Sequence, residues 1–129
     1  MNGFGSPSEF YEGVEVQETF EKEFRPLPED QRFTPMMLIL ILNIYFQLTP
    51  ATMVASTPEV QQLAQLTKLD TEAIVQVLDI YQTCDPYLKR DAMIVSPLLG
   101  PCQKVWQRFG NHEPNELEAY AEELKEYFR

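Results

Sequence analysis

The chain has 129 residues, of which 44% are hydrophobic and 23% are charged. These values are typical of one globular domain that can bury a single core. The two cysteines, Cys84 and Cys102, are too few for a disulfide framework and too far apart for a zinc site, so we expect a reducing, cytoplasmic setting. The sequence does not open with a basic leader, an apolar segment and a small-residue cleavage site, so export is not expected.

The net charge of −10 is concentrated at the two ends of the chain. Residues 1–34 hold eight acids and three bases, and residues 35–110 hold six acids and five bases. Residues 111–129 hold six acids and two bases. The local net charges are therefore −5, −1 and −4. Acidic ends repel phosphate groups, which argues against nonspecific binding to nucleic acids or anionic membranes.

Residues 1–34 are predicted to form an acidic arm that contains one short helix. Residues 1–14 include three of the five glycines, which is typical of a loosely ordered terminus or of an arm that is anchored by its aromatic side chains. Those aromatic residues are Phe4, Phe10 and Tyr11.

The short helix is predicted over residues 15–24. Val16, Phe20 and Phe24 recur every four positions among glutamates, which places them on one face of a helix. Pro26 and Pro28 follow directly and end it, because proline cannot continue the helical hydrogen bonding.

The apolar run over residues 36–48 is predicted to be the central helix of the core. Its 13 residues fall well short of the roughly 20 that cross a bilayer, which disfavours a membrane segment. Thr34 can cap the helix and Pro35 suits its first position. Because the run is apolar nearly all round, we expect other elements to cover it on several sides.

Two further helices joined by a tight turn are predicted over residues 57–83. Thr57 and Pro58 repeat the start signal, and Asp70 can cap the second helix. The apolar positions recur at helical spacing in both segments, which indicates that both face one core. The inward positions are Val60, Leu63 and Ala64 in the first helix, and Ile74, Val77, Leu78 and Tyr81 in the second.

After this pair, residues 87–95 are predicted to form a two-stranded hairpin around a polar turn. A further helix is expected to start at Ser96 and Pro97, or nearer Pro101, and to end at Gly110. A last amphipathic helix is expected to follow Pro114.

Residues 63–78, with the sequence LAQLTKLDTEAIVQVL, resemble the helix-turn-helix of winged-helix domains. Ala64 matches the small residue at the helix crossing. Thr67, Leu69 and Asp70 match the turn, and Ile74 and Leu78 match two buried positions of the second helix. Lys68 departs from the pattern, because those families usually have glycine there, where a positive φ is often needed.

With the helix before it and the hairpin after it, this resemblance covers roughly residues 35–96. It implies a mainly α fold, with a winged-helix-like three-helix core, a short β-hairpin, and flanking N- and C-terminal helices. Residues 35–129 would then form one helical domain.

The second helix of this motif enters the major groove in the DNA-binding members. In this chain that helix contains no lysine or arginine, so its carboxylates would be repelled by phosphates and no arginine could contact guanine. The outward positions are predicted to be Asp70, Thr71, Glu72, Gln76, Asp79 and Gln82.

The leading hypothesis is therefore a non-enzymatic, winged-helix-like domain that binds a protein partner or forms a homodimer, and that does not bind a membrane. Exposed aromatic residues favour interfaces. The candidate interface residues are Phe4, Phe10 and Tyr11 in the arm, and Tyr120, Tyr127 and Phe128 in the last helix.

The alternative is a DNA-binding transcriptional regulator that contacts phosphates through the hairpin and the following helix. Its contact residues would be Lys89, Arg90, Lys104 and Arg108. A third hypothesis is acidic mimicry, in which the protein occupies the basic nucleic-acid site of a partner.

No catalytic, cofactor or metal site is predicted. His112 is the only histidine, and its polar linker supplies no partners for a metal or a catalytic triad. Nothing near Cys84 would lower its thiol pKa, and Cys102 has only Lys104 close in sequence. Glutamate pairs lie on the outer faces of amphipathic helices, where they are solvated.

Overall fold

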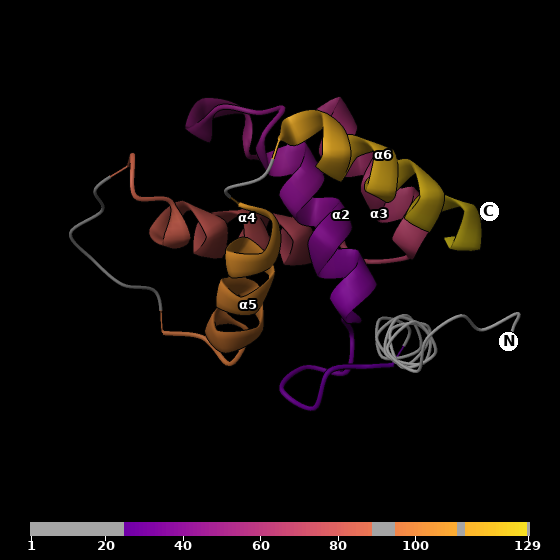
Figure 1. Cartoon of the computed structure of the whole chain (residues 1–129). Coiled ribbons are helices and arrows are strands. Elements are labelled where there is room, and N and C mark those ends of the chain that lie inside the picture. The colour runs from indigo at the N-terminus through magenta and orange to yellow at the C-terminus, as the bar shows by residue number, and fades with distance from the viewer. Residues whose placement is uncertain (1–24, 89–94, 111–112, 129) are drawn as a thin grey trace, which may run out of the picture.

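The computed structural model describes residues 25–88, 95–110 and 113–128 (Figure 1). Within these ranges the chain is mainly helical and contains no strand, so the prediction of a mainly α fold is confirmed. The α-helices are α2 (Pro35–Tyr45), α3 (Pro58–Thr67), α4 (Thr71–Cys84), α5 (Leu99–Phe109) and α6 (Pro114–Lys125), with short 3₁₀ helices at Pro50–Thr52 and Glu126–Phe128.

Two predicted elements fall wholly or mostly outside the described residues. The predicted helix over residues 15–24 lies wholly outside them, and the predicted hairpin lies outside them over residues 89–94. The hairpin is not seen at its described ends, because Tyr87 and Leu88 belong to a turn and Val95 is irregular. Asp85 accounts for that turn locally, since its carboxylate accepts a hydrogen bond from the Tyr87 amide at 2.9 Å.

Helix α2 lies at the centre of the fold, as its sequence predicts. It packs against α3, α4, α5 and α6, and Figure 1 shows it passing through the middle of the bundle. Nine of its 11 residues are buried. Thr34 caps its start by accepting a hydrogen bond from the Met37 amide at 3.3 Å. The helix ends at Tyr45 instead of near Leu48, and the next residue, Phe46, is already 41% exposed.

The turn between α3 and α4 depends on the backbone of one residue. Lys68 has φ 66° and ψ 17°, a left-handed conformation that favours glycine because glycine has no Cβ atom. Among the described residues it is the only non-glycine residue with positive φ. Its amide donates a hydrogen bond to the carbonyl of Ala64 at 2.9 Å, which closes α3 and lets the chain reverse into α4.

Helix α4 faces the core with the stripe that its sequence predicts. Ile74, Val77 and Leu78 are fully buried. The Tyr81 hydroxyl, also buried, donates a hydrogen bond to the carbonyl oxygen of Leu38 in α2 at 2.7 Å, which ties α4 to the central helix.

One predicted position on α4 is wrong. Gln82 was expected to point outward, but it is only 3% exposed. Its amide nitrogen lies 3.2 Å from the sulfur of Met53 and 3.4 Å from a carboxylate oxygen of Asp79. Because the segment after α2 folds back over α4, Gln82 is covered by a residue 29 positions earlier in the chain.

Helix α5 begins at Leu99, between the two starts that the sequence allows. Gly100 and Pro101 lie in its first turn, where amide groups have no partner inside the helix and proline is therefore tolerated. Gly110 caps its end as predicted, and a Cβ at this position would lie 2.6 Å from the carbonyl oxygen of Trp106. Only glycine fits this approach.

Among the described residues, no helix is long and apolar enough to span a bilayer.

We expect replacement of Lys68 by glycine to raise the free energy of unfolding by about 0.5–1 kcal/mol. Glycine adopts positive φ without the clash of a Cβ atom, and this gain exceeds the extra entropy that glycine loses on folding. Urea unfolding checks it. Lys68→Ala is the matched control, since alanine keeps the Cβ and the strain. Equal stability of the two variants would contradict the prediction.

We expect Tyr81→Phe to lower the free energy of unfolding by about 1 kcal/mol, because it removes the buried hydrogen bond to the Leu38 carbonyl together with the hydroxyl's contact with the Cys102 thiol. Tyr87→Phe is the control. That side chain is 91% exposed, so its loss of a hydroxyl should change stability by less than about 0.5 kcal/mol. A Tyr81→Phe protein as stable as the control would show that the hydrogen bond makes no net contribution.

Candidate functional site

A groove of about 440 Å³ lies between the segment before α2, the start of α2 and one face of α5. This volume falls within the range of about 300–1,000 Å³ that is usual for ligand sites. Apolar side chains form most of the lining, and three charged residues complete it. The apolar residues are Leu27, Pro28, Pro35, Leu38, Pro101 and Val105, and the charged ones are Glu29, Lys104 and Arg108.

The wall formed by residues 27–29 is fixed by the loop that carries it. The Leu27 amide donates a hydrogen bond to the Phe33 carbonyl at 2.8 Å, and the Phe33 side chain is fully buried. Asp30 and Arg32 form an ion pair at 2.6 Å across the loop, and the hydrogen bonds from Arg32 lower the pKa of Asp30. The wall is therefore held by both backbone and side-chain contacts.

Helix α5 supplies the basic side of the groove. Lys104 and Arg108 are exposed and lie four residues apart, so they share one face of the helix. Val105 beside them is buried in the core. The guanidinium of Arg108 also lies 4.8 Å from the ring centroid of Phe109. Two positive charges thus stand next to an apolar floor, an arrangement that can bind an apolar segment with acidic flanks.

The structure brings together two of the four predicted phosphate-contacting residues. Lys104 and Arg108 both line the groove, whereas Lys89 and Arg90 lie outside the described residues. The wall at Leu27 was not predicted from the sequence. A leucine between two prolines was the available signal, but its partners on α5 are about 75 positions away in the chain.

The predicted aromatic interface residues have different surroundings. Tyr120 is partly buried, with its ring stacked on Phe109 at a centroid distance of 5.7 Å. Phe128 packs against the core, and Tyr127 is 54% exposed. Phe4, Phe10 and Tyr11 lie outside the described residues.

The outer face of α4 is acidic. Asp70, Glu72 and Gln76 are exposed, and Asp79 is partly exposed. The helix carries no lysine or arginine. Because Gln82 is buried, this face offers one fewer hydrogen-bonding side chain than its sequence suggests.

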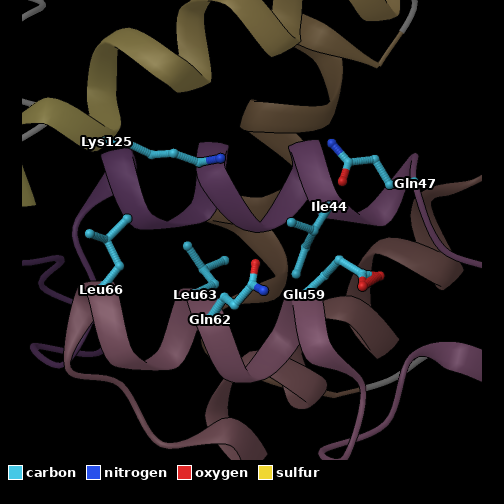
Figure 2. A pocket seen from close by; sticks show the side chains of 7 residues that line it. All are labelled: Ile44, Gln47, Glu59, Gln62, Leu63, Leu66 and Lys125. Carbon is cyan, nitrogen blue, oxygen red and sulfur yellow. The ribbon is translucent and has the colours of Figure 1, made fainter.

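A second pocket lies between α2, α3 and α6 (Figure 2). Its volume is about 230 Å³, below the usual range for ligand sites. Figure 2 shows Lys125 reaching across α2 from α6, and Lys125 donates a hydrogen bond to Glu122 at 2.9 Å. The rest of the lining is a mixture of aliphatic and amide side chains with Glu59. This pocket is a shallow gap at a helix junction.

The two thiols lie in the core or at its edge. Cys102 is fully buried, and burial raises its pKa to about 12. Cys84 is half-buried, and its pKa is also raised by burial. A thiol that keeps its proton at neutral pH is a poor nucleophile. In the described ranges, three or more His, Cys, Asp or Glu residues do not gather as a metal site would require. His112 lies outside those ranges.

Comparisons of the chain with known protein families, curated proteins and solved structures find no match. A function must therefore be inferred from the charge and geometry of these surfaces.

The burial of Cys102 predicts that stability falls as the pH rises above about 9. The thiol of the unfolded chain ionises near pH 9, whereas that of the folded chain does so near pH 12. Between these values the unfolded state binds fewer protons, so the free energy of unfolding should drop by up to about 1.4 kcal/mol per pH unit.

Urea unfolding of the native chain and of Cys102→Ala between about pH 8 and pH 10 measures this slope. The variant should be less stable at every pH but should lose stability more slowly, because the ionising group is gone. Staying near pH 10 limits the contribution of Tyr81, whose pKa burial raises well above its usual value. Parallel curves would contradict the prediction.

Proposed function

We propose that this chain is a non-enzymatic, winged-helix-like domain that acts through protein–protein contacts. The acidic outer face of α4 carries the proposal. In the winged-helix resemblance, this is the face that would enter the major groove of DNA, and the carboxylates of Asp70 and Glu72 there would be repelled by phosphates. A cytoplasmic setting fits the proposal, because Cys84 and Cys102 are both free thiols.

The groove between residues 27–29, α2 and α5 is the docking surface in this proposal. Its apolar lining can take up aliphatic or aromatic side chains, and Lys104 and Arg108 can pair with carboxylates that flank them. A partner segment would therefore be apolar on one side and acidic on the other. Tyr127, which is exposed near the end of α6, offers a second contact surface for a partner or a second copy.

The alternative function, a DNA-binding regulator, draws support from one observation. Lys104 and Arg108 are exposed on the same face of α5, so this helix could contact two phosphates. Two contacts give only weak, salt-sensitive binding, and such a regulator would also need Lys89 and Arg90.

A mobility-shift titration of the full chain with duplex DNA at low salt separates the two functions. We expect no complex at submicromolar protein, because α4 repels phosphate and α5 offers few contacts. Light scattering of the same samples gives the oligomeric state. Salt-sensitive submicromolar binding would overturn the proposal. Binding that disappears when Lys89 and Arg90 are reversed to glutamate would establish the regulator instead.

A further inference from the structure

We propose that the groove between residues 27–29, α2 and α5 binds the chain's own acidic segment, residues 15–24. The inference deepens the proposed docking function and rests on it, because it names the first occupant of the same groove. A partner with a similar segment would then bind by displacing residues 15–24.

The apolar parts of the two surfaces match. The groove exposes the rings of Pro28, Pro35 and Pro101 above a floor of buried aliphatic side chains, and an apolar stripe of similar length would cover these rings. The sequence of residues 15–24 provides such a stripe through Val16, Phe20 and Phe24 at four-residue spacing. Removing this stripe and the exposed proline rings of the groove from water is the main favourable contribution expected for the contact.

The charges of the two surfaces are complementary. The groove carries Lys104 and Arg108 on its α5 side, and Glu29 is the one acid of its lining. The segment carries one base, Lys22, and four acids. The acids are Glu15, Glu18, Glu21 and Glu23. Opposite charges at the rim of an apolar contact set its orientation and exclude competing segments of the wrong sign.

The lengths are also compatible. Only Arg25 and Pro26 separate Phe24 from Leu27 in the groove wall, so the two Cα atoms can lie at most about 10 Å apart. A helix of ten residues would be about 15 Å long, and the stretch of α5 from Pro101 to Arg108 covers about 10 Å. A tether this short gives an effective concentration in the millimolar range, so the linked segment has an advantage over any free one.

Hydrogen–deuterium exchange of the full chain tests the inference. The amides of residues 15–24 should exchange about tenfold or more slowly than those of an unstructured chain. This protection should not depend on protein concentration, because the contact is within one molecule. Exchange at unstructured rates would overturn the inference. Protection that grows with protein concentration would also overturn it, since the occupant would then be a second copy.

Charge reversal locates the contact. In the double variant Lys104→Glu and Arg108→Glu, exchange of residues 15–24 should accelerate roughly two- to fivefold or more. The matched control reverses Lys68 and Lys125, two bases outside the groove, and should leave that exchange unchanged. Equal effects in both variants would show that net charge, and not the groove, controls the segment.

The apolar contribution is tested by the double variant Phe20→Ser and Phe24→Ser, which removes two aromatic rings of the segment and leaves the net charge unchanged. Exchange of residues 15–24 should accelerate about tenfold or more, while exchange of α2 and α4 should not change. Unchanged exchange of the segment would contradict the inference.

The same variant separates this inference from the proposed docking function. A fluorescent peptide with the sequence of residues 13–26 is titrated into the Phe20→Ser, Phe24→Ser protein. The peptide should bind roughly fivefold or more weakly when this protein also carries Lys104→Glu and Arg108→Glu. Peptide binding together with an unprotected native segment would retain the docking function and overturn the internal contact. Absence of peptide binding would overturn the docking function, while the internal contact is judged by exchange alone.

Discussion

The burial of α2 on all sides is the constraint on which the rest of the structure depends. A helix that is apolar nearly all round cannot leave any face in water without a large hydrophobic penalty, and four other helices cover it. Their covering faces are specified by helical spacing, and one buried hydrogen bond fixes the position of α4 along α2. Because the core is formed by α2 and by one face of each neighbour, the outer faces of those neighbours remain available for charged residues.

Local signals in the sequence were enough to predict most of the helices. A threonine followed by proline marks the starts of α2 and α3, and proline alone marks that of α6. These signals act within a few residues, because proline fixes φ at the first helical position and Thr34 adds a side-chain cap to α2. Thr57 and Asp70 stand at the N-cap positions of α3 and α4 but make no side-chain cap hydrogen bond. The left-handed turn between α3 and α4 is equally local, and the unusual Lys68 marks it in the sequence.

What the sequence could not predict depends on contacts between distant residues. Gln82 was predicted to point outward with the other polar residues of α4, yet Met53 covers it. The groove is formed by residues 27–29 and by α5, which no periodicity connects. All four basic residues were named from the sequence, and two of them, Lys104 and Arg108, line the groove. The apolar floor beside them was not predicted. The winged-helix resemblance stays a prediction, because residues 89–94 of its hairpin lie outside the described residues.

The separation of charge in this chain bears on how its surfaces can be used. Acids cover the outer face of α4 and both ends of the chain, whereas Lys104 and Arg108 stand together beside an apolar groove. Opposite surfaces on one chain could in principle pair two copies. However, the net charge of −10 repels a second copy at long range, most strongly at low salt. A segment tethered to the groove through two residues does not have to overcome that repulsion to approach it. The charge distribution therefore favours an internal contact over self-association, and it favours external partners whose acidic segments bind more tightly than the chain's own.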